Sequence, residues 1–455
     1  MKILSFLSVL LLTCVLAIGG ANSIGQLPPL AFLLDPNQGF WQNSYSEDQL
    51  AEEALSLENL QAPVEVVYDE QLIPHLYAEN ELDLYRAQGY ITAKHRLWQM
   101  EFQTRAAAGR LAELVGPMAL ELDRMTRRKG LAYGAELGID YLKKEDPATL
   151  ALVEAYADGV NQYIGQLTDA RLPIEYKILN YKPEAWSAYK SLLLLKYMSD
   201  MLVGDRDLEY SNLKKILGKA KLDRLYPEFP KENDPVIEKE RIWEFQSLYP
   251  PKPDSLNYPE ETLQLEALTQ PIEGTGSNNW AVSGKKTKNG HPILANDPHL
   301  SLNLPSLWYS MQLSTPAHTV KGATLPGALG VISGFNQDIA WGVTNATKDT
   351  RDWFKITFQD ASRKAYKYGQ EWKATEFRIE EIKIKGQETY LDTVVYTHYG
   401  PVVYDKTFKS DRQDVNFALR WIVHQGNSNE QKTFLQLNKA KNHAAYTEAL
   451  MTYAA

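Results

Sequence analysis

The sequence predicts an α+β protein, in which helices and strands occupy separate parts of the chain. Residues 81–164 carry apolar side chains at helical spacing. From residue 277 onward, short apolar or alternating runs are separated by Gly, Pro, Asn and Asp, which is the pattern of strands. Between these parts, residues 227–276 contain eight prolines and many acidic residues. This composition indicates an exposed linker or an excised spacer.

Length and composition limit the classes of function that the chain can have. The chain has 455 residues, enough for one large domain or for more than one core. Its 10 Trp and 26 Tyr argue against disorder. A net charge of −9 without a basic patch excludes a nucleic-acid partner. The sequence also shows no Cys/His spacing typical of zinc and no glycine-rich phosphate loop, so no organic cofactor is expected.

The N-terminal residues 1–23 have the pattern of an export signal. Lys2 supplies a positive charge, residues 3–18 are almost all apolar, and small residues follow at 19–23. We therefore expect export to the periplasm, with no stable membrane span after signal cleavage. An uncleaved N-terminal membrane anchor is the alternative. The single cysteine, Cys14, lies in this segment, so the mature chain has no thiol nucleophile.

Two helices are predicted in the first part of the chain. One covers residues 81–116 and stops at Gly116. A second begins after Asp146, a suitable N-cap, with Pro147 at its first position. Its apolar face is expected to join the core rather than to line a ligand pocket. That face consists of Leu152, Val153, Tyr156, Val160, Tyr163 and Ile164.

Strands are predicted for the runs that follow the proline-rich stretch. Each is short, apolar or alternating, and bounded by residues that favour turns. The runs are "NWAVSG", "HPILAND", "LWYSMQL", "GVISG", "DIAWGV" and "DWFKITF".

The junction "EGTGSNNWAVSG", residues 273–284, places Ser277 directly behind Gly276. One interpretation is a turn, in which the serine hydroxyl bonds nearby backbone. The other is self-cleavage, in which the hydroxyl attacks the Gly276 carbonyl and the resulting ester hydrolyses. Ser277 would then carry a free α-amine, whose ordinary pKa of about 8 suits it to act as the base for its own hydroxyl.

Six separate blocks can be compared with known families: "PHLYAENELDLYRAQGYITAKHRLWQMEFQTRAAAGRLAELVG", "GTGSNNWAVSG", "LANDPHL", "GFNQDIAWGVTNATKDTRDWF", "THYGPVV" and "ALRW". In this order they resemble the penicillin acylase family of N-terminal-nucleophile hydrolases. The resemblance runs from about Ala62 to the end and implies the family's αββα sandwich with a largely helical A-subunit part. It implies that residues 24–230 are the A part, 231–276 the spacer and 277–455 the N-terminal portion of the B part. Cleavage of one precursor would make the two parts a heterodimer.

The resemblance also assigns catalytic residues. Ser277 matches the nucleophile, and the substrate would be a small-molecule N-acyl amide, such as a β-lactam with an acyl side chain or an acyl-homoserine lactone. His299 matches a residue that holds the serine and its amine by hydrogen bonding. Asn345 matches the residue whose backbone N–H contributes to the oxyanion hole.

A calcium site and an acyl pocket follow in the same way. One Ca²⁺ per heterodimer is expected at Asp349, Asp352 and the carbonyl of Arg351, with Glu209 from the A part. Hard oxygen ligands suit this ion. A mostly apolar acyl pocket is expected from these residues: Ser199, Val203, Leu300, Ile332 and Ser333.

The resemblance has one departure: the family's B subunit continues past the point where this sequence stops. The sequence is then either a fragment or a naturally truncated protein. The family's second oxyanion donor lies in that later part, so we expect the 455-residue chain as written to be an inactive enzyme, with strand edges left unpaired. Two functions stay open. One is a self-processing amide hydrolase, and the other is a non-catalytic binding relative that keeps the fold. The intact Gly276–Ser277 junction and His299 favour the first.

Overall fold

The structure, a computed structural model, describes nine stretches of the chain. They are residues 2–22, 29–44, 54–204, 206–226, 276–300, 302–346, 348–408, 415–427 and 429–453. Of the predicted spacer, residues 231–276, only Gly276 is described, so the spacer and its boundary with the A part lie outside the described residues.

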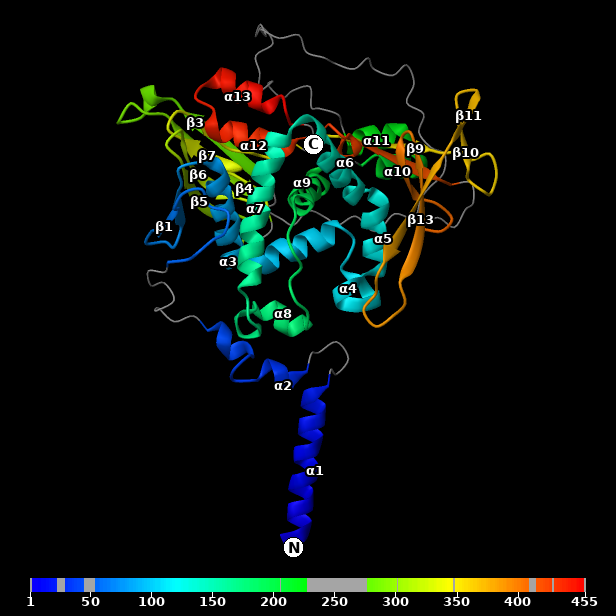
Figure 1. The fold of residues 1–455 in the computed structure, drawn as a ribbon. Coiled ribbons are helices and arrows are strands. Elements are labelled where there is room, and N and C mark those ends of the chain that lie inside the picture. The colour runs from blue at the N-terminus through cyan, green and yellow to red at the C-terminus, as the bar shows by residue number, and fades with distance from the viewer. Residues whose placement is uncertain are drawn as a thin grey trace.

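Helices dominate the first half of the described chain, and two more lie near the end (Figure 1). The α-helices are α1 (Lys2–Ala21), α2 (Leu30–Leu33), α3 (Glu81–Ala107), α4 (Ala112–Val115), α5 (Leu120–Lys129), α6 (Leu131–Glu145), α7 (Pro147–Gly165), α8 (Ile174–Leu179), α9 (Ala188–Leu202), α10 (Asp207–Leu217), α11 (Lys219–Leu225), α12 (Glu430–Lys439) and α13 (His443–Leu450). Short 3-10 helices are η1 (Phe40–Asn43), η3 (Gly116–Ala119), η4 (Asp169–Arg171), η5 (Gly284–Lys286) and η6 (Ile422–His424).

Strands form mainly from residue 276 onward. They are β1 (Glu65–Tyr68), β2 (Pro74–Tyr77), β3 (Gly276–Val282), β4 (Ile293–His299), β5 (Tyr309–Ser314), β6 (Thr319–Thr324), β7 (Ser333–Asn336), β8 (Ala340–Trp341), β9 (Arg351–Lys355), β10 (Ala365–Tyr368), β11 (Glu371–Ala374), β12 (Glu376–Ile382), β13 (Tyr390–Thr397), β14 (Gly400–Tyr404) and β15 (Phe417–Trp421). Each of the six predicted runs overlaps one of these strands, and the predicted α+β class is confirmed.

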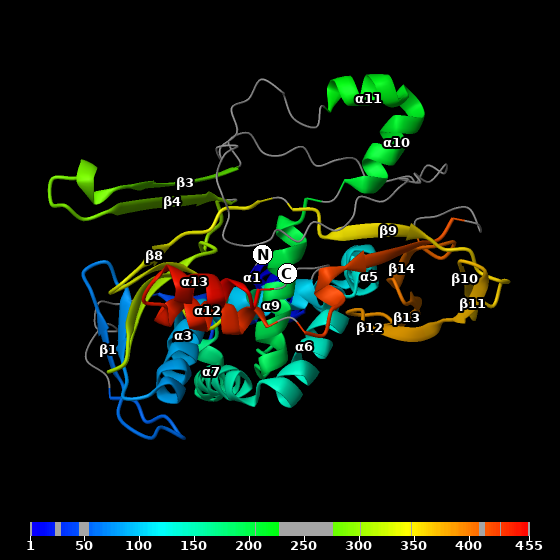
Figure 2. The same ribbon diagram turned by 90° about the horizontal axis from the view of Figure 1, so that it is seen from above.

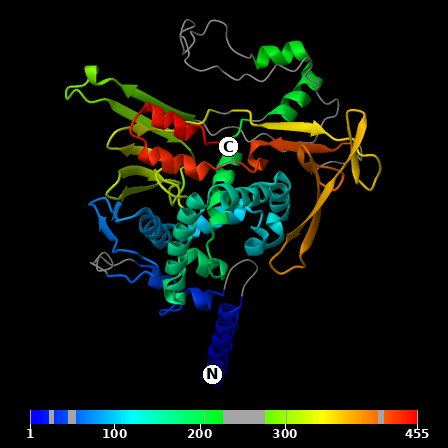
Figure 3. The same cartoon turned by 45° about the horizontal axis from the view of Figure 1, so that its top comes forward.

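The described strands form two large sheets and two separate hairpins. One sheet has the order β1-β2-β5-β6-β7-β8 and the other β12-β13-β14-β15-β9. In the first hairpin β3 pairs with β4, and in the second β10 pairs with β11. The two sheets lie on opposite sides of the helices (Figure 3). In the six-stranded sheet the described pairs are antiparallel except β2 with β5, which run parallel. Through that pair, two strands from before the proline-rich stretch join a sheet formed by strands that follow it.

The predicted helix over 81–116 is only partly correct. Helix α3 begins as expected, with the Asn80 side chain accepting a hydrogen bond from the Asp83 N–H, but it ends at Ala107. Gly109 then adopts a left-handed conformation, φ +61°. The carboxylate of Asp123, on α5, accepts the backbone N–H groups of Leu111 and Ala112 and so starts the separate helix α4. The Asp123 side chain, from a later helix, therefore satisfies backbone N–H groups that a continuous helix would have paired internally.

The second predicted helix is confirmed. Helix α7 begins at Pro147, and the Asp146 side chain accepts the Thr149 N–H at 3.1 Å. The predicted apolar face is buried or packs against the main hydrophobic core, as a core helix requires.

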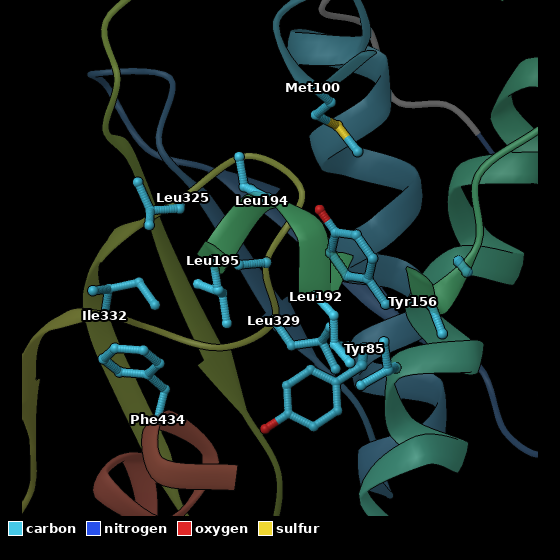
Figure 4. Close-up of a cluster of buried hydrophobic side chains, with 14 of the residues drawn as sticks. Tyr85, Met100, Tyr156, Leu192, Leu194, Leu195, Leu325, Leu329, Ile332 and Phe434 are labelled. Atoms are coloured by element: carbon cyan, nitrogen blue, oxygen red, sulfur yellow. The ribbon is translucent and has the colours of Figure 1, made fainter. Parts of the chain in front are cut away.

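Helices α3 and α7 cross at a contact that only glycine permits. A Cβ atom on Gly159 would lie 1.9 Å from the carbonyl oxygen of Arg86, and one on Gly89 would lie 2.1 Å from that of Tyr156. Around this crossing, side chains from α3, α7 and α9 meet others from the loop after β6 and from α12 (Figure 4). The labelled members are Tyr85, Met100, Tyr156, Leu192, Leu194, Leu195, Leu325, Leu329, Ile332 and Phe434.

A buried guanidinium ties the helices to the five-stranded sheet. Arg128, on α5, is fully buried and donates to both carboxylate oxygens of Asp392, at 2.7 and 2.6 Å. It also donates to the Val403 carbonyl and lies 3.3 Å from Asp405. Asp392 and Asp405 are themselves buried. Arg128 is the cation that both carboxylates share, while Arg124 also contacts Asp392 and Arg363 also binds Asp405.

The same network gives the Asp392 carboxyl a pH dependence. Burial alone would raise its pKa, but the hydrogen bonds and charge of Arg128, with help from Arg124, outweigh burial and hold the pKa below its ordinary value. A lowered folded-state pKa contributes stability that is present above the unfolded pKa of about 3.9. This contribution is lost as the pH falls through the lower folded-state value.

Replacing Arg128 by Met should lower the free energy of unfolding by about 3 kcal/mol at neutral pH, because two buried carboxylates lose the cation that they share and keep only Arg124 and Arg363. Urea unfolding followed by circular dichroism measures the change. The matched control is Lys219→Ala, which removes an exposed ion pair with Asp223 and should cost about 0.5 kcal/mol or less. Similar midpoints for the two variants would contradict a structural role for the Arg128 network.

Candidate functional site

Ser277 lies at the start of the β3–β4 hairpin, which Figure 2 shows as a ribbon beside β8. The strands pair so that Gly276 faces His299 and Ser277 faces Pro298. Residues directly opposite in an antiparallel pair share a face, and side chains alternate along each strand. One face of the hairpin therefore carries the side chains of Ser277 and Asn296.

The face that carries Ser277 is attached to the end of the six-stranded sheet through Asn296. Its side-chain amide donates to the Val343 carbonyl at 3.0 Å and accepts from the Ser333 hydroxyl at 3.0 Å. Gly342 allows this approach, because a Cβ there would lie 2.4 Å from Cγ of Asn296. Asn296 is not among the residues predicted from the sequence, although it stands inside the "LANDPHL" block.

His299 belongs to the other face of the hairpin. Its Nε2 lies 2.8 Å from a carboxylate oxygen of Asp297, two positions back on the same strand. The His299 side chain is 37% exposed. Among the described residues no hydrogen bond joins Ser277 to His299, although their strands are adjacent. The predicted role of His299 in holding the serine therefore stays a prediction, and Asp297 is a partner that the sequence did not point to.

Asn345 lies in the segment between β8 and β9, which reaches both the hairpin and helix α9. Its neighbour Val343 provides the carbonyl that Asn296 binds. The carbonyl of Lys348, in the same segment, accepts the Gly204 N–H at the end of α9. The segment thus lies between the β3–β4 hairpin and the end of α9, and the oxyanion role of Asn345 stays a prediction.

The predicted pocket residues lie around this segment but are not all open to it. Ser333 binds Asn296, and Leu300 directly follows His299 with its N–H on the Pro298 carbonyl. Ser199 and Val203 lie at the C-terminal end of α9, and the Ser199 hydroxyl donates to the Leu195 carbonyl.

Ile332 is 4% exposed, and its side chain packs in the core near Phe434 (Figure 4). Its contacts are those of a core residue. Ser333 and Leu300 therefore lie at the hairpin, whereas Ile332 is buried in the core.

The predicted calcium ligands are distributed over α10 and β9. Helix α10 packs on the five-stranded sheet, where Leu208 joins a cluster with Trp353. One carboxylate oxygen of the neighbouring Glu209 is buried with no hydrogen-bond partner. Asp349 accepts the Arg351 N–H at 3.4 Å, and Asp352 lies opposite Arg420. In the part of the chain that the structure describes, no group of three acidic or histidine side chains could hold a metal ion.

Asp200, which the sequence did not point to either, connects the site to the A part. Its carboxylate accepts from the Arg351 side chain at 3.0 Å and from Lys129 at 2.9 Å. Asp200 follows Ser199 on α9, and Arg351 begins β9. One carboxylate thus fixes the position of a predicted calcium ligand relative to a predicted pocket helix.

A cavity of about 1100 Å³ lies elsewhere, between β1, β2, α3 and the end of β5. None of the predicted site residues lines it. At its wall the Tyr68 hydroxyl lies 2.9 Å from Nε2 of His95. Burial, with the charges of Lys94 and Arg96, lowers the pKa of His95 to about 4, so this histidine is neutral at physiological pH.

Comparison with known proteins gives a consistent result. The family model described as penicillin amidase matches residues 63–455. The acyl-homoserine lactone acylase QuiP of Pseudomonas aeruginosa is 33% identical over 320 residues, covering 70% of this chain and 37% of that protein. The penicillin acylase 2 proenzyme of Pseudomonas sp. strain SE83 is 31% identical over 360 residues, covering 77% and 45%.

Two further comparisons concern penicillin G acylases. The Escherichia coli protein is 23% identical over 430 residues, covering 81% of this chain and 50% of the relative. A solved thermostable enzyme from Alcaligenes faecalis superposes on 39% of this chain and 31% of its own, with a TM-score of 0.36 and 24% identity. The chain spans half or less of the length of the QuiP acylase, the proenzyme and the Escherichia coli protein.

Substituting Asn296 by Ala should loosen the β3–β4 hairpin from the sheet. Each lost hydrogen bond is worth about 1 kcal/mol, so backbone amides of β3 and β4 should exchange with deuterium about tenfold faster or more. Hydrogen exchange followed by mass spectrometry measures this. Asn278→Ala is the control, because Asn278 is exposed on the opposite face of the same strand pair. Equal exchange in the two variants would show that Asn296 does not hold the hairpin.

Proposed function

This chain belongs to the penicillin amidase family, and from that premise we propose that its gene product is a self-processing amide hydrolase with Ser277 as the nucleophile. The observation that carries the proposal is the attachment of the Ser277 face of the hairpin, through Asn296, to the segment that contains Asn345. A substrate carbonyl must be able to lie about 3 Å from both the nucleophile and the oxyanion donor, so the two must be held near each other.

The main catalytic groups in the proposed chemistry are the Ser277 hydroxyl and the α-amine that cleavage gives to the same residue. The Ser277 hydroxyl attacks the Gly276 carbonyl, the chain shifts to an ester, and water releases Ser277 with a free α-amine. In turnover that amine takes the hydroxyl proton as the oxygen attacks the substrate amide, and it then protonates the leaving amine. Water next hydrolyses the acyl ester left on Ser277, which releases the carboxylic acid and restores the hydroxyl. The Asn345 N–H would stabilise the oxyanion in both reactions.

The substrate proposed is an N-acyl amide with an apolar acyl group. The relatives are named as acylases of acyl-homoserine lactones and of penicillin, and both names imply cleavage of an acyl amide. In this chain Leu300 and Val203 offer apolar surface beside polar groups, as acyl pockets require. The hydrophobic N-terminal segment supports an exported enzyme that works in the periplasm.

We propose that the A and B parts stay together as a heterodimer after cleavage, and contacts between them support this. Strand β2 pairs with β5, and Arg128 is buried against Asp392. The ammonium of Lys196 lies 2.6 Å from the Glu430 carboxylate, with both side chains buried. One relative is itself named a proenzyme.

The alternative function is a binding protein that keeps the fold without catalysis. The two proposals differ in maturation, because a binding protein needs no cleavage at Gly276–Ser277. A denaturing gel of the product of the complete gene shows one band or two. N-terminal sequencing of the smaller product should read Ser-Asn-Asn-Trp if the hydrolase proposal is correct.

We also propose one calcium ion, held by Asp349, Asp352, the Arg351 carbonyl and Glu209. In the described structure these carboxylates do not form a metal-holding group, and they would have to converge on the ion. The fit rests on the chemistry of the donors and on the buried Glu209 oxygen that has no hydrogen-bond partner, since an unsatisfied buried carboxylate oxygen is costly without a cation. When bound, the ion would supply charge that holds α10 of the A part against β9 of the B part.

Ser277→Ala should abolish both chain cleavage and hydrolysis of a chromogenic acyl amide, with turnover falling at least about a thousandfold, because one hydroxyl serves both reactions. Turnover is measured on the product of the complete gene. Ser310→Ala, an exposed serine on β5, is the control and should change turnover by less than about twofold. His299→Ala should reduce turnover less than Ser277→Ala does, because positioning costs less than losing the attacking atom. Turnover retained by Ser277→Ala would refute the assignment.

Calcium added to the chelator-treated protein should raise its melting temperature, because an ion that binds only the folded state stabilises it by about 2.7 kcal/mol at a hundredfold excess over Kd. The Asp352→Asn variant should lose this response, as measured by differential scanning calorimetry. Asp360→Asn, in the loop after β9, should keep it. A response that survives in the Asp352→Asn variant would exclude this site.

A further inference from the structure

The N-terminal helix α1 is long and apolar enough to cross a membrane. Residues Ile3–Ala21 have a mean hydropathy of 2.5, and none of this segment is buried against the protein. At about 1.5 Å per residue it measures about 29 Å, close to the roughly 30 Å hydrocarbon core of a bilayer. Helix α1 projects from one end of the molecule, beside α2 and α8 (Figure 1). This fact alone does not separate a signal sequence from an anchor.

The C-terminal end of α1 has features that favour an anchor. The small residues that would be a cleavage site are helical up to Ala21, and the Asn22 side chain donates to the Ile18 carbonyl at 2.7 Å. Gly20 faces α2, where a Cβ would lie 3.6 Å from that of Ala31. Proteases cleave extended backbone, and this end of α1 is instead helical as far as Ala21.

The segment after α1 is fastened to the body by a buried lysine. Lys177, on α8, is 0% exposed, and its ammonium donates to the carbonyls of Gly39 and Ala170 and to the side chain of Asn43. Asn43 in turn donates to the Leu172 carbonyl. We call residues 29–44 together with α8 the collar. Because the collar belongs to the folded body, it fixes the place where α1 leaves the protein.

The collar presents apolar side chains to solvent at the end where α1 leaves. Between 36% and 56% of each residue is exposed, and the members are Leu30, Leu34, Trp41, Ile174 and Ile178. Residues 29–44 carry a single charge, Asp35, whose carboxylate is used in a local turn, and α8 adds Glu175 and the buried Lys177. An aromatic and aliphatic surface of low charge beside a membrane-length helix suits the boundary between lipid and water.

We propose that α1 is retained as a membrane anchor and that the collar rests on the bilayer surface, with Leu30, Leu34, Trp41, Ile174 and Ile178 in contact with lipid. Lys2 marks the cytoplasmic end of α1, so the body lies on the outer side. Only six residues, 23–28, separate Asn22 from Pro29, and fully extended they span about 25 Å. The body therefore stays beside the membrane instead of diffusing away. This inference is independent of the proposed hydrolase activity.

The test labels one introduced cysteine at a time, so the single native cysteine, Cys14, is replaced first. In a Cys14→Ser background, one new cysteine at a time is placed by Trp41→Cys or Ile178→Cys and labelled with an environment-sensitive fluorophore. The control is Trp372→Cys on β11, 47% exposed and far from α1 (Figure 1). The full-length proteins are reconstituted into vesicles of phosphatidylethanolamine and phosphatidylglycerol that contain lipids with a shallow nitroxide quencher.

Labels at positions 41 and 178 should be quenched several-fold more strongly than the label at 372. Equal quenching at all three positions would overturn the contact between collar and bilayer. Intact mass of protein isolated from cell membranes tests retention separately. A chain that starts between residues 20 and 24 and leaves the membrane in carbonate would overturn the anchor, whereas a carbonate-resistant chain that still carries residues 3–21 supports it.

Discussion

The close crossing of α3 and α7 is the constraint on which the rest of the fold depends. Gly89 and Gly159 let the two helix backbones touch, so the helices pack at a separation that no side chain could allow. At that separation the hydroxyl oxygen of Tyr156 reaches the Gly327 N–H and accepts its hydrogen bond at 3.0 Å. Gln88, beside Gly89, exchanges two hydrogen bonds with Gly330. The loop that leads into Ser333 is therefore positioned by the helices.

Buried charge completes the connection between the two parts of the chain. Arg128 with Asp392 and Lys196 with Glu430 each place a cation of the A part against a carboxylate of the B part. Such pairs add little net stability compared with apolar contacts of the same size, but removing one partner is costly. They therefore specify which surfaces meet. Asp200 pairs with both Lys129 and Arg351, and so also specifies which surfaces meet at the edge of the candidate site.

Local sequence signals predicted local structure well. The Asp146–Pro147 helix start and the strand runs were found because cap residues and alternation act over a few residues. The end of α3 was missed because Asp123, from the following helix, decides it. For the site, the resemblance drew attention to Ser277, but Asn296 and Asp297 went unnamed. Which side chains share a face depends on the register of β3 against β4, and the sequence does not reveal that register.

The parallel pairing of β2 with β5 has a consequence for the order of folding. The two strands are joined by most of the A part and the whole proline-rich stretch, so their contact has a very large separation in sequence. Loop-closure entropy opposes such a contact, and contacts of this kind form late. During vectorial transport from the N-terminus, the helices emerge while one edge of β2 still lacks its neighbour. Strand β2 therefore keeps an unpaired edge until residues 309–314 have arrived to close the sheet.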